Sequence, residues 1–208
     1  MRIVVAVLAG VLVAACNAVV TSTAVFGPDD AAGAAGLRDG VWTAGPDAKC
    51  RYSERAPITA WPDCASRLVI KGGQWMELKR DGARWSWDST SILLAAGQPM
   101  IVQLYVPANT ETAATFNYAG LEPTARDGQG RITAFTGWQV LCGPPPPDPA
   151  QGQPKRYGTL TPLPGLTMDA SNDDCTTTSK EAIRNAALAS RPWDRSPTTL
   201  HWVRDGAI

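Results

Sequence analysis

Alternating apolar and polar residues recur in short segments along most of this chain, and turn-forming residues separate the segments. A period of two is typical of strands that bury one face. The pattern predicts strands at 40–42, 67–71, 74–88 as a hairpin, 92–95, 100–106, 112–121, 131–141 and 198–204. Because short turns join most neighbours, we expect a mainly β fold. It would be an antiparallel meander, barrel-like or strongly curved, with one C-terminal helix and a final strand.

Residues 74–88 have the most regular pattern in the chain. Asp81-Gly82 suits a two-residue turn, because both central positions need a positive φ, and this turn pairs Leu78 with Trp85. One face of the hairpin then carries Met76, Leu78, Trp85 and Trp87. We expect that face to be buried and the opposite face, which carries Trp75 and Arg84, to face solvent.

Two segments near the C-terminus interrupt the strands. Residues 143–168 hold eight of the seventeen prolines, and proline cannot donate to a β ladder, so this stretch is expected to leave the sheet. It is either a stiff spacer or a polyproline ligand for an aromatic groove in a partner. After it, Thr178 and Glu181 fit a capping box for a helix that ends at Arg191-Pro192. We see no second domain or internal repeat, so residues 37–208 are expected to form one domain.

The N-terminus has the features of an export signal. Residues 3–15 carry no charge, and this run is too short to span a membrane but has the length of the apolar part of a secretory signal. The run ends in Val13-Ala14-Ala15-Cys16. Over residues 1–17 the sequence resembles the lipobox of bacterial lipoproteins, in which the cysteine is lipidated and becomes the new N-terminus.

This resemblance implies a signal peptide at 1–15 and a lipidated Cys16 that attaches the protein to a membrane, each buried methylene contributing about 0.8 kcal/mol. Asn17 follows, whereas aspartate at that place is the family's usual signal for retention in the inner membrane. The resemblance therefore implies an outer-membrane lipoprotein that faces the periplasm, with the cell surface as the other orientation. The alternative is an ordinary signal peptide with a chance cysteine.

Residues 16–36 are mostly small and have no useful period. Such composition is typical of a flexible tether, which would let the domain stand off the membrane. The alternative is an N-terminal strand through Val19-Val20 and Val25-Phe26 that packs on the domain.

Composition narrows the class of protein. The 208 residues contain 19 Lys+Arg and 19 Asp+Glu without a basic run, which argues against a nucleic-acid partner, because that binding depends on clustered positive charge. With eight tryptophans, the chain is also too rich in large apolar residues to be disordered as a whole. The expected partners are the membrane, through the lipid, and an envelope protein or a small ligand.

Four further cysteines are available for disulfides in the oxidising compartment that export implies, namely Cys50, Cys64, Cys142 and Cys175. They allow three connectivities, of which we favour nearest-neighbour pairing. A zinc site is the weaker alternative, because no C-x-x-C occurs and His201 is the only histidine. We therefore predict neither a metal nor another cofactor.

No catalytic arrangement stands out. A nucleophile activated by histidine would have to use His201, and no Gly-x-Ser-x-Gly motif accompanies it. Paired carboxylates are possible in any fold, but no two acids are marked by the sequence. The tryptophan excess would allow a ligand to stack on the sheet, with Trp75 and Arg84 as speculative binding residues; the alternative is that the tryptophans fill the core.

A stretch with Gly40-Val41-Trp42, Cys50 and Trp61-Pro62-Asp63-Cys64-Ala65 resembles a segment of small uncharacterised bacterial lipoproteins, and no activity comes with this resemblance. We thus predict a lipid-anchored, non-catalytic envelope lipoprotein that binds a ligand or partner. The alternative is a periplasmic hydrolase or envelope-modifying enzyme that uses carboxylates. Two convergent acids in a polar-lined pocket would favour the enzyme, and a filled barrel with an exposed apolar patch would favour a binding module.

Overall fold

The computed structural model describes residues 17–44, 50–81, 84–110, 112–144, 161–169, 174–193 and 197–206. The predicted signal peptide and Cys16 lie outside these ranges, as do residues 145–160 of the proline-rich segment.

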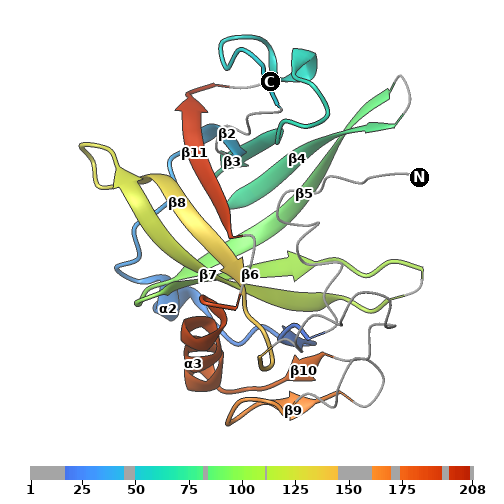
Figure 1. The fold of residues 1–208 in the computed structure, drawn as a ribbon, viewed down its shortest axis with the longest axis vertical. Coiled ribbons are helices and arrows are strands. Elements are labelled where there is room, and N and C mark those ends of the chain that lie inside the picture. Colours follow the sequence, from blue (N-terminus) through green and yellow to red (C-terminus); the bar gives the residue numbers. More distant parts are fainter. Residues whose placement is uncertain are drawn as a thin grey trace, which may run out of the picture.

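Eight antiparallel strands form a closed barrel (Figure 1). In order around the barrel they are β2 (Gly40–Ala44), β3 (Leu68–Lys71), β4 (Gln74–Asp81), β5 (Arg84–Ala95), β6 (Met100–Val106), β7 (Thr115–Arg126), β8 (Ile132–Gln139) and β11 (Thr198–Arg204). β11 pairs with both β8 and β2, and β7 pairs with β8, so the ring is complete. The predicted mainly β class is confirmed, in the form of an up-and-down barrel, which has no free edge within its ring.

The β4–β5 hairpin differs from its predicted register. Leu78 pairs with Trp87 and Asp81 pairs with Arg84, so the register is shifted by two residues from that of a turn at Asp81-Gly82. A shift of two residues leaves every side chain on its predicted face, because the side-chain period of a strand is two. β5 is also one strand of 12 residues, where the pattern predicted a strand that ends at residue 88 and a separate one at 92–95.

The barrel interior holds a large group of buried apolar side chains, which includes Trp42, Leu68, Ile70, Trp75, Val102, Leu121, Phe135 and Leu200. Trp75 is only 9% exposed, so the expectation that it faces solvent is wrong. The physical reason is closure of the sheet. An open sheet can leave one face in water, whereas a closed barrel turns that face inward.

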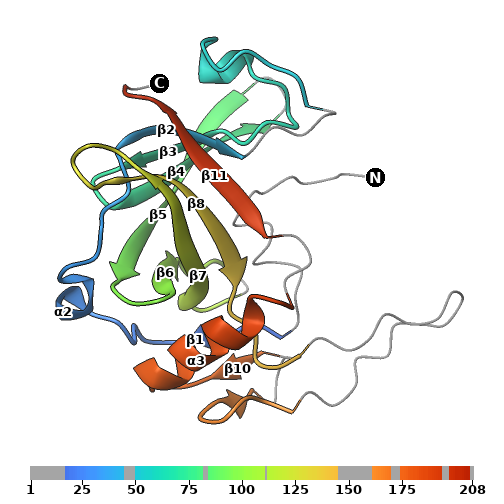
Figure 2. The ribbon, with the colours of Figure 1, turned by 60° about the vertical axis from the view of Figure 1, so that its left-hand side comes forward.

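Residues 50–66 form a layer over the outer surface of β2, β3, β4 and β11 (Figures 1 and 2). This layer contains the 3-10 helix η1 (Ile58–Ala60) and the disulfide Cys50–Cys64, whose Cα atoms are 5.7 Å apart. Trp61 is 2% exposed and packs with Val41 and Val69. The same layer contacts the apolar face of the hairpin, formed by Met76, Leu78, Trp85 and Trp87. That face therefore packs against an external layer and not against the barrel interior.

A second layer lies on the opposite side of the barrel (Figures 1 and 2). It consists of β1 (Val20–Thr21), β9 (Thr167–Met168), β10 (Cys175–Thr176) and α3 (Lys180–Ser190). The buried residues of α3 are Ala182, Ile183, Ala186, Ala187 and Ser190. The helix is capped by Ser179, whose side chain accepts a hydrogen bond from Ala182 N, and not by the predicted Thr178. A second disulfide, Cys142–Cys175, completes the nearest-neighbour connectivity.

The N-terminal segment packs on the barrel, so the predicted flexible tether is wrong for residues 17–36. β1 pairs with Phe116 and Asn117 of β7, and Val19 and Phe26 are 1% and 2% exposed. β7 extends past the end of β8, and this leaves an edge to which a two-residue strand can add without an amphipathic pattern of its own. The alternative of an N-terminal strand that packs on the domain is correct for the packing, but the strand covers only Val20–Thr21 and does not include Val25-Phe26.

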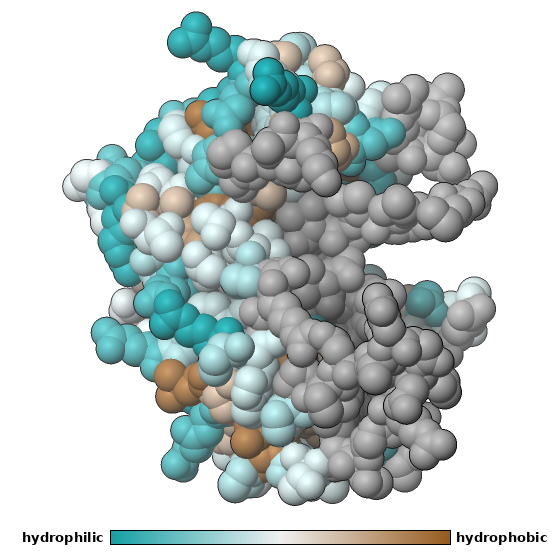
Figure 3. Space-filling model, in the orientation of Figure 1, coloured by the Kyte–Doolittle hydropathy of each residue, from teal (hydrophilic) through white to brown (hydrophobic). Residues whose placement is uncertain are grey.

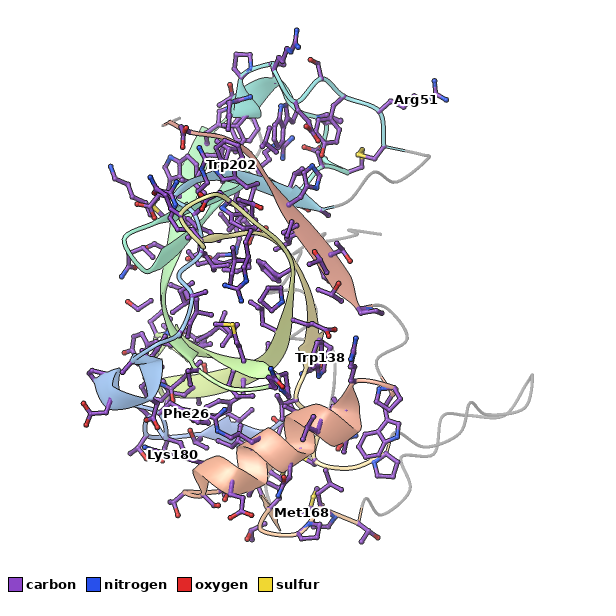
Figure 4. The ribbon with its side chains drawn as sticks, turned by 90° about the vertical axis from the view of Figure 1, so that its left-hand side faces the viewer. Phe26, Arg51, Trp138, Met168, Lys180 and Trp202 are labelled. Carbon is purple, nitrogen blue, oxygen red and sulfur yellow. A yellow bond between two sulfur atoms is a disulfide. The ribbon has the colours of Figure 1, made fainter. Side chains whose placement is uncertain are left out.

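The continuation of this segment closes one end of the barrel. After the short helix α2 (Pro28–Ala31), the side chains of Ala34, Ala35 and Leu37 pack against the interior core. The Arg38 guanidinium then lies 3.6 Å above the Trp202 ring and pairs with Asp205 at 2.9 Å. Figure 4 views the barrel nearly along its axis, with Trp202 at the rim. Within the described residues, no helix is long and apolar enough to cross a membrane.

Candidate functional site

The other end of the barrel is polar and partly exposed on its inner side. Interior-facing residues that retain solvent exposure there are Ala44, Glu77, Thr90, Ile92, Val106, Asn117 and Thr198. We call this region the Glu77 end and define its polar part as Glu77, Lys79, Asp88, Thr90 and Asn117. It contrasts with the end closed by residues 33–38, where the inner residues Trp42, Ile70 and Ile132 are buried.

The long β4–β5 hairpin positions most of this polar group. Trp75, Glu77 and Lys79 alternate along β4 and so share the inner face. Their partners across the hairpin are Thr90, Asp88 and Ser86. The hairpin projects past the neighbouring strands (Figure 1), which exposes the outermost of these residues. The inner wall therefore changes from apolar at Trp75 to charged at Lys79 within a few residues.

Glu77 is the most buried acid of the group. Its side chain is 19% exposed, and the nearest described positive charge is Lys79 Nζ at 3.9 Å, which is too far for a hydrogen bond. Burial raises the pKa of Glu77, Lys79 opposes the rise, and the Asp88 carboxylate adds to it. The Glu77 carboxylate is therefore partly shielded from water, and no described residue donates a hydrogen bond to it.

Lys79 and Asp88 form the outer, more exposed part of the Glu77 end. Lys79 Nζ donates a hydrogen bond of 2.6 Å to Asp88 Oδ2, and this bond raises the pKa of Lys79. The Asp88 side chain is 63% exposed. Because Lys79 Nζ is hydrogen-bonded to Asp88 and lies farther from Glu77, it offsets the charge of Glu77 only weakly.

Asn117 lies on β7, three strands around the ring from Glu77. Its Oδ1 atom is buried and has no hydrogen-bond partner among the described residues. Buried polar atoms without a partner are rare and costly, so a second acceptor at this end also lacks a donor. Both acceptors would be satisfied by a molecule that brings hydrogen-bond donors.

The two binding residues that the sequence suggested, Trp75 and Arg84, are not brought together. Trp75 lines the inner wall, where its partner is Thr90, while Arg84 pairs with Asp81 at the tip of the hairpin. Six residues along β5 separate the two positions, or about 20 Å at the rise of a strand. The Arg84 side chain lies outside the described part of the structure.

The histidine and the cysteines, which the sequence offered as possible catalytic or metal-binding residues, have structural contacts in the described ranges. His201 Nε2 lies 2.8 Å from Glu54 Oε1 on the outside of the barrel, and the four cysteines 50, 64, 142 and 175 are in disulfides. No described group of three or more His, Cys, Asp or Glu side chains is placed to hold a metal. No nucleophile in the described ranges is hydrogen-bonded to His201.

The outer surface shows little apolar clustering. On the face seen in Figure 3, brown hydrophobic residues are scattered among teal and white ones. The large hydrophobic residues that are exposed in the described part are Tyr105 on β6 and Leu188 on α3. These belong to different layers of the molecule, and isolated exposed apolar residues are normal on a soluble surface. The Glu77 end therefore remains the best candidate site.

Sequence reasoning missed the principal residue of this site. The alternation in residues 74–88 placed Glu77 beside Trp75 on one face, but that face was expected to be solvated. A signal was present, because Trp75 interrupts an otherwise polar face and a large aromatic residue there favours burial. What the alternation does not reveal is that the sheet closes on itself.

Fold and site together define an antiparallel up-and-down barrel with one end closed by its N-terminal segment and a half-buried acid at the other. Comparisons with protein-family models, with curated proteins and with solved structures give no significant match to this chain.

Proposed function

We propose that this protein is a lipid-anchored envelope lipoprotein whose barrel binds one small amphipathic ligand at the Glu77 end. The observation that carries the proposal is the Glu77 carboxylate, half-buried at the end of an apolar inner wall and without a described hydrogen-bond donor. The interior of an eight-stranded barrel is either filled by side chains or holds one small ligand. Here several inner residues near Glu77 keep solvent exposure.

The chemistry of the wall defines the ligand class. An apolar part would contact Trp75 and Ile92 on the inner wall, and its burial supplies the main driving force. A head group that donates hydrogen bonds, such as an amine, would satisfy Glu77 and Asn117. A negatively charged head group is disfavoured, because it would lie beside Glu77 and Asp88.

The alternative of a carboxylate enzyme rests on the direct opposition of Glu77 and Asp88 across the hairpin. Two acids that meet in this way can take the roles of acid and base when their pKa values differ. Asp88, however, is hydrogen-bonded to Lys79 and mostly exposed. This arrangement supports recognition of a ligand more than proton transfer to one.

The binding proposal is tested with two amphiphiles of equal chain length and opposite charge, dodecylamine and dodecanoate, below their micelle concentrations. We expect saturable binding of dodecylamine by native mass spectrometry and tryptophan fluorescence, about tenfold tighter than dodecanoate, which corresponds to about 1.4 kcal/mol. Glu77→Gln should remove most of this difference. Lowering the pH through the raised pKa of Glu77 should weaken the binding of dodecylamine, because a neutral carboxyl does not attract an ammonium.

The matched control for this test is Glu181→Gln, which removes an exposed acid from α3, outside the barrel. It should leave the preference between the amphiphiles unchanged. Absence of saturable binding by both amphiphiles would show that the barrel is filled and would refute the proposal. Equal effects of the two substitutions would refute the role of Glu77.

The anchoring half of the proposal is tested by Cys16→Ser in the full-length chain. We expect the wild type to fractionate with the outer membrane and to incorporate a labelled fatty acid. The serine variant should stay in the soluble fraction without label, because it lacks the thiol that carries the diacylglyceryl group and so has no acyl chains to bury. If the serine variant still fractionates with membranes, the anchor is not at Cys16.

A further inference from the structure

The first described residue, Asn17, is fixed firmly in the fold. Its backbone N donates to Asp174 Oδ1 at 3.3 Å, and its side-chain Nδ2 donates to Gly143 O at 2.9 Å. Its carbonyl accepts from Cys142 N at 2.8 Å, and the residue is 4% exposed. Asn17 therefore has hydrogen bonds on its backbone and its side chain before β1 begins.

The next two residues are fixed to the same group. Ala18 N donates to Asp174 Oδ1 at 3.0 Å, Ala18 O accepts from Cys175 N at 3.0 Å, and Val19 forms a parallel bridge with Cys175. The disulfide Cys142–Cys175 joins the two parts of the chain that hold this segment. The N-terminal segment is thus attached at every residue from 17 to 19.

Because of this attachment, no flexible linker separates the lipid from the domain. A flexible linker of the 20 residues that the sequence suggested would have an average reach of about 25 Å. A single peptide unit separates the Cα atom of Cys16 from that of Asn17, a distance of about 3.8 Å. Acyl chains on Cys16 would therefore hold Asn17 next to the lipid head groups.

We infer that the surface around Asn17, formed by Asp174, β9 and β10, lies directly against the bilayer, so that the domain is held in one orientation. This inference rests on the proposed lipidation of Cys16. The opposite side of the molecule, covered by residues 50–66, then faces away from the membrane. Figure 4 shows the two sides at opposite ends of the molecule, with Met168 of β9 at one and Arg51 at the other.

The charge of this surface indicates how it is held. Residues 161–169 and 174–178 contain no Lys or Arg, while Asp169 and Asp174 are acidic. Basic residues are what attract a protein to anionic lipids, and salt weakens that attraction. The orientation therefore depends on the anchor and should be the same on neutral and anionic vesicles and at high salt.

The test places a fluorescent amino acid at either of two exposed positions of the full-length, lipidated protein in lipid vesicles. Thr176 is in β10, beside the proposed contact surface, and Arg51 is in the layer on the opposite side. Lipids with a nitroxide on the head group quench only fluorophores that come close to them. We expect at least twofold quenching at position 176 and none at position 51, with or without anionic lipid.

A matched variant restores the missing linker by inserting 20 Gly and Ser residues between Cys16 and Asn17, with Asn as the first inserted residue. It should make quenching at the two positions similar, because a flexible linker allows all orientations. Similar quenching at both positions without the insertion would overturn the inference while leaving the anchor intact. Failure of the unaltered protein to join vesicles would instead refute the proposed lipidation.

Discussion

Replacing Cys142 and Cys175 together by Ala is expected to lower the free energy of unfolding by about 4 kcal/mol. The disulfide closes a loop with a sequence separation of 33, and the stabilisation from restricting the unfolded chain lies between about 3 kcal/mol for 15 residues and about 4.7 for 100. Both cysteines are almost fully buried, at 0% and 1% exposure, so the substitution also removes core contacts. Urea unfolding followed by tryptophan fluorescence measures the loss.

The control is the corresponding pair Cys50→Ala and Cys64→Ala. Its sequence separation is 14, so the same reasoning predicts a smaller loss of about 3 kcal/mol. The two double substitutions should also differ in which residues become less protected from hydrogen exchange. Only the first holds β10 beside Val19, so only its loss should speed hydrogen exchange at residues 17–21. An unchanged urea midpoint for the first pair would contradict this account of the layer.

Gly120→Ala is expected to destabilise the protein by about 3 kcal/mol, although it adds one methyl group. A Cβ atom at this position of β7 would lie 2.4 Å from the Trp138 ring, far inside contact distance. Trp138 cannot move freely, because its Nε1 donates to Ala187 O at 2.8 Å and the ring lies between the barrel and α3 (Figure 4). Overpacking costs about 1–3 kcal/mol, and loss of the hydrogen bond adds about 1.

Thermal unfolding should show this as a fall of about 10 °C in Tm, given about 2–4 °C per kcal/mol for a chain of this size. Gly128→Ala is the matched control, since a Cβ there meets no atom within 4 Å, and its Tm should be nearly unchanged. In a Trp138→Ala background, the cost of Gly120→Ala should largely disappear. Equal costs in the two backgrounds would show that the indole is not the obstacle.

The strands could be predicted from the sequence because their side chains alternate. Residues 100–106 were predicted as a strand and form β6 with the same bounds, and the faces of the β4–β5 hairpin were also separated correctly. The environment of each face could not be predicted. Alternation distinguishes two faces, and whether a face meets water, the barrel interior or an outer layer is decided by segments far away in the sequence.

The candidate site shows the same limit. Glu77 has no motif around it, and its burial arises because β4 belongs to a ring closed by the β11–β2 and β11–β8 pairings. Residues 17–36 were misjudged for a related reason. Their composition resembles a linker, but the extended edge of β7 and the Cys142–Cys175 disulfide provide bonding positions that composition does not reveal.

The place of β11 in the ring has a consequence for how the chain folds. Its residue Leu200 pairs with Ala44 on one side and Phe135 on the other, and α3 precedes it in the sequence. Until β11 joins, β2 and β8 each expose an unpaired edge, and such edges can associate with other chains. Pairings between such distant residues also slow folding. A chain that crosses a membrane from its N-terminus would therefore keep an open, association-prone sheet until its final strand arrives.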